Sequence, residues 1–438
     1  MSHPRSVSAS GPSSRRQFLK HSGVLAGSAI AGLAIVRGAH AAGSDTLKVG
    51  LIGCGGRGSG AAVNALNADE NAKLVAMADV FADKVMASRK QLAAAKPEQV
   101  AVDDDHCFVG FDAYRQLIES GVDVVLIATA SKFHPLYLQA CVAAGKHVFV
   151  EKPHAVNAPD LNTVTEACAQ AETKGLSVVS GLCYRYHQGV QETINRVLDG
   201  AIGDIVAIQE TYARSPYQII SRKPEWTDMQ WQMRNWYHFR WLSGADILQS
   251  LVHSLDKAAW VMREEPPISA WGVGGRSSCF DPVHGDQFDH SAIVYEYANG
   301  VRMFGFSRAQ AGCYTETSDH ILGTKGRCNV LKHRIEGQTN WTYKGPECNM
   351  YDAELRALFA AIRAGKPINN GLYMVRSTML GIIAEMAVRT GQKITWDQAL
   401  KSKEVLGPAA VSWETDPPVE LGPDGLYPCP IPGITQFS

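Results

Sequence analysis

The chain has 438 residues, of which 45% are hydrophobic and 19% are charged. This length and composition are typical of a globular protein with more than one sizeable core, at about 150 residues per domain. The 42 basic and 43 acidic residues leave a net charge of -1. No excess positive charge is available to neutralise phosphates, so we expect no nucleic-acid partner.

Residues 1–41 have the pattern of a twin-arginine export signal. Arg15 and Arg16 precede the apolar, glycine-rich run 23–36, and the Ala-His-Ala sequence at 39–41 provides the small residues of a cleavage site. The run is shorter than the roughly 20 residues of a membrane-spanning helix, so we expect cleavage rather than stable membrane insertion. The twin-arginine translocase is then a partner during export, and the mature protein is periplasmic or extracytoplasmic. An uncleaved, membrane-tethered form is the alternative.

A glycine-rich loop, GCGGRG at 53–58, follows the first predicted strand, 46–52, and leads into a helix. Glycines permit a tight turn and close approach of the backbone to a pyrophosphate, and the free amides of the helix N-terminus attract that anion. The strand, loop and helix together predict a dinucleotide site. The residues expected to contact the cofactor in this loop are Gly53, Gly55, Gly56, Arg57 and Gly58.

An aspartate, Asp79, ends the second predicted strand, 73–78. It follows the last glycine of the loop by about 20 residues, where an acidic side chain accepts hydrogen bonds from both ribose hydroxyls. Because a carboxylate repels a 2′-phosphate, Asp79 favours NAD over NADP. A helix-capping aspartate in a turn is the alternative interpretation.

Strands and helices alternate in the region that follows. The run 122–128 is a continuous Val, Ile and Leu segment, typical of a strand buried on both faces, and a helix at 136–144 leads to a strand at 147–150. This alternation predicts an α/β fold with a doubly wound parallel sheet, the Rossmann fold, over residues 46–178.

The sequence Glu-Lys-Pro-His at 151–154 follows this last strand. Parallel sheets bind ligands at the carboxyl ends of their strands, so Lys152 is expected beside the nicotinamide. There it can donate to a substrate hydroxyl oxygen and, partly desolvated, take part in proton transfer. A surface lysine in a turn is the alternative interpretation.

The segments GLIGCGGRGSG, DVVLIATASKFHP and VFVEKP resemble the Gfo/Idh/MocA (glucose-fructose oxidoreductase/inositol dehydrogenase) family. The resemblance continues through 234–262, 285–302, 365–396 and the final YPCPIPGITQFS, and is closest to exported members with twin-arginine leaders. It implies a second α/β domain at 179–400, built on a large, mostly antiparallel open sheet. It also implies a C-terminal tail at 401–438 that packs on the body.

The resemblance further implies the chemistry of the protein. Sugar, inositol or related polyol substrates would lie between the two domains, and homo-oligomers would form through the open sheet face. Lys152 and His253 would act together in proton transfer. Thr129, His134 and Glu151 would join Lys152 among the residues that contact the cofactor.

Two segments depart from the family pattern. Gln249 stands where many sugar dehydrogenases of the family have an aspartate four residues before His253, and 128–131 reads Ala-Thr-Ala-Ser where the family usually has Ala-Thr-Pro. A neutral amide cannot raise the basicity of a histidine as a carboxylate does. Either Asp246 or Asp256 substitutes for the missing acid, or nothing does.

Further substrate contacts are expected from one helix face and from aromatic residues. Gln249, His253, Asp256 and Trp260 share one face, which suits either a cleft or solvent. Flat aromatic rings and forked donors suit carbohydrate, whereas core packing is the alternative for each aromatic residue. The candidate substrate contacts are Tyr184, Arg185, Trp236, Tyr237, Gln249, His253 and Asp256.

No metal site is expected. The loop 281–290 carries Asp and His residues, but their spacing matches no helix-borne ligand pair. The ten cysteines include no Cys-x-x-Cys pair, which argues against a zinc ribbon or a thioredoxin-like site and leaves a disulfide open.

Export and NAD together constrain the function. Outside the cytoplasm, NAD is not exchanged with a cellular pool, so the chemistry must return the cofactor to its starting state. The first hypothesis is an oxidoreductase that oxidises a sugar or polyol hydroxyl and reduces a second carbonyl on the same tightly bound nicotinamide. The second is an NAD-dependent redox-neutral glycosidase or lyase, and the third is a non-catalytic sugar or nucleotide binder.

Overall fold

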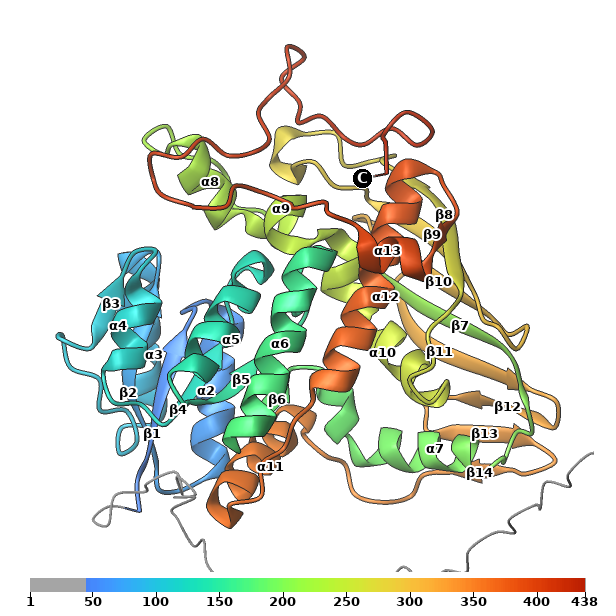
Figure 1. Ribbon diagram of the computed structural model, residues 1–438, viewed down its shortest axis with the longest axis horizontal. Coiled ribbons are helices and arrows are strands. Elements are labelled where there is room, and N and C mark those ends of the chain that lie inside the picture. The colour runs from blue at the N-terminus through green and yellow to red at the C-terminus, as the bar shows by residue number, and fades with distance from the viewer. Residues whose placement is uncertain (1–44, 438) are drawn as a thin grey trace, which may run out of the picture. The chain divides into compact units, whose positions relative to one another are not determined.

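Two β-sheets organise the protein. The computed structural model describes residues 45–437, and the chain from Thr46 onward forms one compact unit. Six parallel strands make sheet A in the order β3-β2-β1-β4-β5-β6, and nine strands make sheet B (Figure 1). The expected fold class, a Rossmann sheet followed by a large, mostly antiparallel sheet, is confirmed. The expected signal segment lies outside the described residues.

Sheet A consists of short apolar strands. Every residue of its strand β4 is buried, as expected for a strand covered on both faces. The strand order reverses between β1 and β4, so the carboxyl ends of these two strands flank the crevice where such sheets bind ligands. The strands are β1 (Leu47–Ile52), β2 (Ala72–Asp79), β3 (Cys107–Val109), β4 (Val124–Ile127), β5 (His147–Val150) and β6 (Val178–Ser180).

The helices on sheet A include one from far along the chain. α11 (Met350–Ala364) packs against α2 and contributes Leu355 and Phe359 to the apolar cluster that contains β1. A part of the region expected for the second domain therefore completes the core of the Rossmann domain. The other helices here are α2 (Gly56–Ala68), α3 (Ala82–Ala95), α4 (Ala113–Glu119), η1 (Ser131–Phe133), α5 (His134–Ala143) and α6 (Ala158–Lys174).

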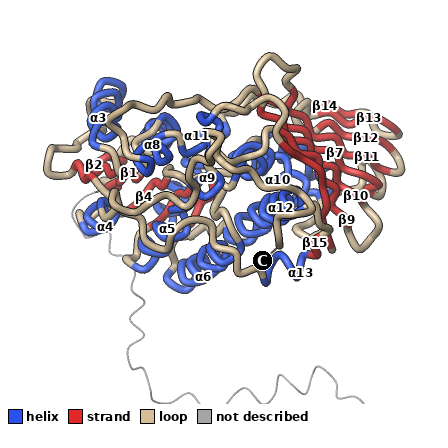
Figure 2. The backbone as a smooth tube through the Cα atoms, turned by 90° about the horizontal axis from the view of Figure 1, so that it is seen from above, coloured by secondary structure: helices blue, strands red, loops and turns tan. Residues whose placement is uncertain are grey.

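Sheet B has one covered and one open face. Figure 2 shows α10 (Val252–Val261) and α12 (Gly371–Thr390) on one side of it. On the other side Val206, Val273 and Leu322 are 54%, 65% and 48% exposed. β10 runs parallel to β7, and the other neighbours are antiparallel. The strands are β7 (Ile205–Arg214), β8 (Ser269–Gly275), β9 (His290–Glu296), β10 (Arg302–Ala309), β11 (Glu316–Gly323), β12 (Gly326–Asn329), β13 (Arg334–Gly337), β14 (Trp341–Thr342) and β15 (Ile394–Thr395).

Short helices connect the two sheets. A π-helical turn, η4 (Ile247–Leu251), runs directly into α10, and α13 (Trp396–Lys401) precedes the tail. In Figure 1 the tail passes over α8 and α9, and its Gly433 amide bonds the Thr390 carbonyl at the end of α12. The remaining elements are η2 (Cys183–Tyr186), α7 (Gln188–Leu198), α8 (Asp228–Arg234), η3 (Trp236–His238), α9 (Arg240–Ser243) and η5 (Pro282–His284).

Helix α12 belongs to the core. It is the one helix of residues 45–437 that is long and apolar enough to cross a membrane, but 72% of its apolar window is buried inside the protein. It packs against α6, α10 and β8, and so joins the helix layer of sheet A to that of sheet B. All ten cysteines are free thiols.

The loop after β5 is anchored by His154. This side chain is fully buried, with Nδ1 3.0 Å from Thr378 Oγ1 of α12 and Nε2 2.9 Å from Ser180 Oγ of β6. Because hydroxyls both donate and accept, a neutral imidazole satisfies both contacts. Burial lowers the pKa of His154 to about 3, so the ring is neutral at physiological pH.

A second buried histidine, His134, supports the same loop. Its Nδ1 lies 2.8 Å from the Pro153 carbonyl and its Nε2 lies 3.0 Å from the Thr129 carbonyl. Burial lowers the pKa of His134 to about 4. The two histidines therefore fix the loop that carries Lys152, provided that both stay uncharged.

We expect stability to fall in acid because of these histidines. The pKa of each is lower in the folded than in the unfolded chain, so below about pH 6.5 the unfolded chain binds more protons. Between about pH 6.5 and its folded pKa, each histidine lowers the free energy of unfolding by about 1.4 kcal/mol for every pH unit of acidification. His154→Gln should lower stability at pH 7.5 but flatten its dependence on pH between 4.5 and 6.5, measured by urea unfolding. Equal pH slopes for the two proteins would contradict this account.

Candidate active site

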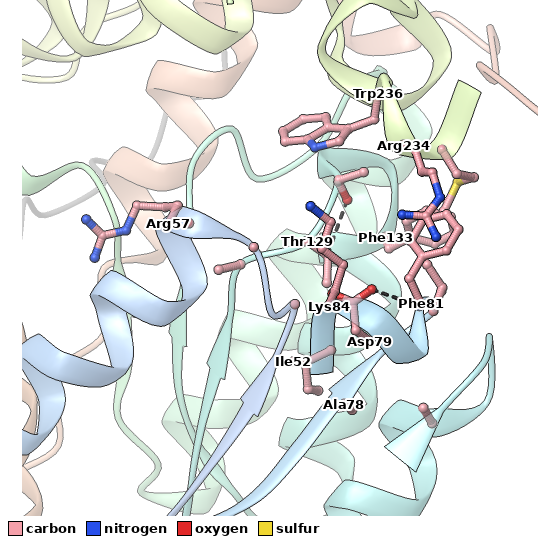
Figure 3. Close-up of a pocket in the computed structure, with 18 of the residues that line it drawn as sticks. Ile52, Arg57, Ala78, Asp79, Phe81, Lys84, Thr129, Phe133, Arg234 and Trp236 are labelled. Carbon is pink, nitrogen blue, oxygen red and sulfur yellow. Dashed lines mark hydrogen bonds between the residues drawn. The ribbon is translucent and has the colours of Figure 1, made fainter. Parts of the chain in front are cut away.

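A cavity of about 210 Å³ lies at the carboxyl edge of sheet A, beside the ends of β1, β2 and β4. Figure 3 shows Asp79 and Thr129 on the Rossmann side of this cavity and Trp236 on the opposite side. Tyr237 and Gln218 also line it from the second domain. Both domains therefore enclose the crevice that the strand order predicts.

The glycine loop has the shape of a dinucleotide cradle. Gly53 has a φ of +97°, and a Cβ there would lie 2.4 Å from the Ala128 carbonyl oxygen. A Cβ on Gly58 would lie 1.8 Å from the Gly53 carbonyl oxygen, so helix α2 packs against the loop only with glycine at this place. By contrast, nothing lies within 4 Å of where a Cβ would stand on Gly55 or Gly56. These residues fit a pyrophosphate that approaches the backbone at the N-terminus of α2.

Asp79 lies at the wall of this cavity. Its Oδ2 accepts from the Cys54 amide at 2.7 Å and its Oδ1 accepts from the Phe81 amide at 3.0 Å. Burial raises the pKa of Asp79, and the two amide hydrogen bonds oppose the rise. Helix α3 has Phe81 at its N-cap without any side-chain cap, so the alternative of a helix-capping aspartate does not apply. Each carboxylate oxygen keeps acceptor capacity for a ribose hydroxyl.

Arg57 and Glu151 join the glycine loop to the loop after β5. Arg57 Nε lies 3.0 Å from Glu151 Oε1, and its guanidinium lies 4.8 Å from the centre of the Tyr351 ring. Figure 3 shows the Arg57 side chain directed away from Asp79. Glu151 also accepts from the Lys152 amide at 3.2 Å. Arg57 also lines the cavity, as expected of a residue that contacts the cofactor, whereas Glu151 supports it from outside the cavity wall.

Thr129 and His134 occupy different positions relative to the cavity. Thr129 lines it, as expected of a residue that contacts the cofactor. His134 is 1% exposed, is not part of the cavity wall, and contacts the Thr129 carbonyl from behind. The structure therefore gives His134 a supporting position.

Lys152 and His253 come together from the two domains. Lys152 Nζ donates to the Gln249 carbonyl oxygen at 2.5 Å, one turn before His253. Nδ1 of His253 is buried and has no hydrogen-bond partner among residues 45–437. Burial lowers the pKa of His253 well below its usual range, and the positive charges of Lys152 and Lys257 add to this effect. The imidazole is therefore neutral.

The two departures from the family pattern touch each other. Gln249 Nε2 donates to Ser131 Oγ at 3.0 Å and to the Ser243 carbonyl at 2.5 Å, and the residue is 2% exposed. The π-helical turn changes the register ahead of His253, so the expected line of polar side chains is broken. In its place, the backbone carbonyl of Gln249 faces Lys152. No carboxylate contacts the imidazole of His253 within the described chain.

Arg185 and Asp256 form an internal ion pair. Arg185 Nε bonds both oxygens of Asp256 at 3.0 Å, and Arg185 Nη2 bonds Glu264 at 2.8 Å. The guanidinium lies between the rings of Trp260 and Tyr373, 4.7 and 4.3 Å from their centres. Arg185 and Asp256 were expected to form hydrogen bonds with substrate, but their polar groups bond each other and Glu264 instead. These internal contacts argue against the predicted role of the two residues in substrate binding.

The aromatic candidates divide between the cavity and its surroundings. Trp236 and Tyr237 line the cavity and stack on each other with centres 3.8 Å apart. Tyr184 meets His253 edge-on at 5.6 Å. No sequence pattern indicated Tyr217, which stacks on Tyr237 with ring centres 4.1 Å apart and donates to the Gln249 carbonyl at 3.2 Å. Tyr217 belongs to no motif and follows strand β7, so only the folded chain brings it to this site.

The acidic loop 281–290 has structural partners. Asp289 Oδ2 accepts from the amides of Ser277, Ser278 and Cys279 at 2.9, 2.8 and 3.1 Å. Partial burial raises the pKa of Asp289, but the hydrogen bonds from His290 and from the Ser277 and Ser278 amides outweigh it and hold the pKa well below its usual range, so the charged carboxylate stabilises this turn. Within residues 45–437 no group of three or more His, Cys, Asp or Glu is arranged to hold a metal ion.

Known proteins share this sequence pattern. Residues 47–180 match the model of the Gfo/Idh/MocA family, described as an oxidoreductase family with an NAD-binding Rossmann fold. The chain is 24% identical over 337 residues to inositol 2-dehydrogenase of Salmonella paratyphi B. That alignment covers 74% of this chain and 88% of the relative.

Solved structures share the fold. Aldose-aldose oxidoreductase from Caulobacter crescentus, complexed with glycerol, superimposes with a TM-score of 0.62 at 19% identity, covering 80% of this chain and 99% of that one. Scyllo-inositol dehydrogenase from Lactobacillus casei, with bound NAD(H) and scyllo-inositol, gives the same TM-score, identity and coverage. Residues 47–180 are therefore similar to the NAD-binding Rossmann domain of the Gfo/Idh/MocA oxidoreductase family, and the fold of the described chain agrees with that similarity.

Proposed function

We propose that this protein is an NAD-dependent oxidoreductase that acts on a CH–OH group of a polyol or sugar. The observation that carries the proposal is that Lys152 reaches across the domains to the Gln249 carbonyl, four residues before His253, and that its charge adds to the effect of burial in lowering the pKa of this histidine. Lys152 supplies an ammonium group, and His253 supplies a neutral imidazole whose buried Nδ1 has no partner in the described part of the chain. Relatives named for inositol support a polyol substrate.

The side chains divide the work of alcohol oxidation. Bound NAD supplies the hydride acceptor. The Lys152 ammonium keeps two hydrogens beyond the one given to Gln249, so it can hold the reacting oxygen and stabilise negative charge as the hydroxyl proton leaves. His253 binds a neighbouring hydroxyl, because its low pKa keeps Nδ1 and Nε2 as one donor and one acceptor. Trp236 and Tyr237 provide flat apolar faces beside the cavity.

We also propose that the cofactor is NAD rather than NADP. Asp79 presents a buried carboxylate at the cavity wall, where a ribose hydroxyl is a hydrogen-bond donor and a 2′-phosphate is a second anion. Lys84 also lines this part of the cavity and attracts Asp79, but it does not form an ion pair with that carboxylate.

The first experiment tests cofactor and chemistry together. The mature protein, purified without added nucleotide and denatured, should release NAD rather than NADP, identified by mass spectrometry. The holoenzyme should then reduce its nicotinamide with myo-inositol, scyllo-inositol or glucose, followed at 340 nm. Lys152→Ala should lower the rate by a factor of about 1000, since it removes the group that stabilises the reacting oxygen.

The variant Lys146→Ala is the matched control, because it removes a lysine from the same domain whose Nζ bonds the Val122 carbonyl away from the cavity. An active Lys152→Ala enzyme would contradict the proposal. Cleavage of a glycoside without an acceptor would favour the redox-neutral glycosidase or lyase. Bound NAD with no turnover of any sugar would favour the binder.

We further propose that NAD stays bound between turnovers and is recycled internally. Arg234 of the second domain lines the cavity, lies 3.9 Å above the centre of the Phe81 ring, and bonds both oxygens of Asp83 at 2.8 and 3.0 Å. Trp413 of the tail packs on Phe81 at 5.2 Å and on Phe111 at 4.7 Å. These contacts cross the cleft at the Asp79 end, where the adenosine would lie, and oppose cofactor release.

Variants at this closure should release NAD faster. Arg234→Ala removes the ion pair and the cover over Phe81, so we expect the dissociation rate of NADH to rise at least tenfold, measured by the loss of its fluorescence on dilution into excess NAD. Trp413→Ala should raise it by a factor of about 3 to 10. Tyr314→Ala, a 75% exposed ring elsewhere, is the control. Rates within twofold of wild type for both closure variants would exclude this role.

Export and assembly complete the proposal. We propose that the twin-arginine segment sends the folded holoenzyme out of the cytoplasm, and that the open face of sheet B forms a homo-oligomer. Fractionation and native mass spectrometry should find a periplasmic oligomer, cleaved near Ala41, with NAD bound. Replacing Arg15 and Arg16 by Lys should retain the protein in the cytoplasm. A cytoplasmic wild-type protein would refute export, and a periplasmic monomer would refute only the oligomer.

A further inference from the structure

Tyr217 and Lys152 converge on one atom. The carbonyl oxygen of Gln249 accepts from Lys152 Nζ at 2.5 Å and from the Tyr217 hydroxyl at 3.2 Å. The two donors come from different domains, one from the loop after β5 and one from the segment after β7. Because the two donors share one acceptor, a substrate oxygen placed between them can contact both.

The Tyr217 ring is held on both faces. The Tyr237 ring stacks on one face with centres 4.1 Å apart and an interplanar angle of 12°, and the Arg214 guanidinium lies 3.4 Å from its centre. Tyr237 lines the cofactor cavity. The phenol therefore keeps a fixed direction without a hydrogen bond from any ligand.

A buried chain of hydrogen bonds leads inward from Tyr217. Its hydroxyl lies 3.2 Å from Ser250 Oγ, and Ser250 donates to Asp246 Oδ1 at 2.8 Å. Arg214 donates to Ser250 Oγ at 2.7 Å and to Asp246 at 2.5 Å. Ser307 donates to the other oxygen of Asp246. Ser250 and Asp246 are only 0% and 6% exposed.

The hydrogens in this chain have definite places. Ser250 gives its one hydrogen to Asp246, so the Tyr217 hydrogen points to Ser250 Oγ or to the Gln249 carbonyl. Tyr217 therefore keeps an oxygen lone pair that can accept a hydrogen. His253, the other candidate acceptor at this site, resists protonation because of its burial and the lysines around it.

We propose that Tyr217 is a catalytic residue that accepts the proton of the oxidised hydroxyl, at the head of a relay through Ser250 to Asp246. This inference rests on the proposed function. The O–H bond of the substrate breaks and its proton binds Tyr217 Oη, while the Tyr217 proton moves to Ser250 Oγ and the Ser250 proton moves to Asp246 Oδ1. The C–H electron pair leaves as hydride to the nicotinamide, and the oxygen electrons form the carbonyl. Reduction of a second carbonyl reverses every transfer.

Such a relay gives the acid Asp246 a role that the sequence left open. The carboxylate does not contact His253, but it is the terminal proton acceptor of the chain that begins beside Lys152. Arg214 and Ser307 both donate to this carboxylate, so Asp246 keeps a fixed place at the end of the relay.

The test measures single-turnover reduction of the bound nicotinamide by saturating myo-inositol, in mixtures of H₂O and D₂O. Tyr217→Phe keeps the stacked ring and removes the hydroxyl, and should lower the rate about 100-fold with less than threefold change in KM. Ser250→Ala should lower the rate about tenfold. The wild-type rate should follow a curved dependence on the D₂O fraction, because several protons move together, and this dependence should become linear in Ser250→Ala.

The matched control is Ser307→Ala. It removes a hydroxyl that donates to the same Asp246 carboxylate but lies outside the path from Tyr217, so the curved dependence should remain. A Tyr217→Phe rate within threefold of wild type, or a curved dependence in Ser250→Ala, would overturn the relay. If wild-type holoenzyme fails to oxidise myo-inositol, scyllo-inositol and glucose, the proposed function itself fails, and the relay fails with it.

Discussion

The site depends on one short loop, residues 151–154, being fixed between the two sheets. His154 joins this loop to α12 and β6, while His134 supports it from α5. Both contacts need neutral rings in an interior that opposes charge, and burial provides that neutrality by lowering both pKa values. With the loop fixed, Lys152 extends across the domain junction to the backbone of the helix that carries His253.

Burial also determines how the charged side chains around this junction are paired. Two ammonium groups, those of Lys152 and Lys257, influence His253, and no carboxylate balances them at the ring. The carboxylates of the second domain instead meet cations a little farther away, as buried charges must. These pairs are Arg214 with Asp246, Arg185 with Asp256 and Lys257 with Asp319. Because Asp319 pairs with Lys257, Lys152 is the cation beside His253 that has no carboxylate ion pair among the described residues.

The cofactor cavity is built by distant parts of the chain. The glycine loop and Asp79 come from the first strands, the opposite wall comes from 218–237, and the tail reinforces the adenosine end through Trp413. Helix α11 returns to cover α2, with Asp352 bonded to Asn64 at 2.7 Å. Each of these contacts couples the shape of the cavity to the packing of the whole body.

The sequence by itself determined whatever depends on local pattern. Apolar runs and the glycines specified the parallel strands and the tight turn at Gly53, because periodicity and backbone sterics act within a few residues. It also indicated Lys152 and His253, through position at a strand end and family resemblance. The tertiary structure decided which polar groups bond other parts of the protein and which stay available to a ligand. It assigned Arg185 to an internal ion pair, turned Gln249 toward Ser131 through a π-helical turn, and brought Tyr217 to the carbonyl that holds Lys152. Those outcomes depend on packing between residues far apart in the chain, which no local pattern encodes.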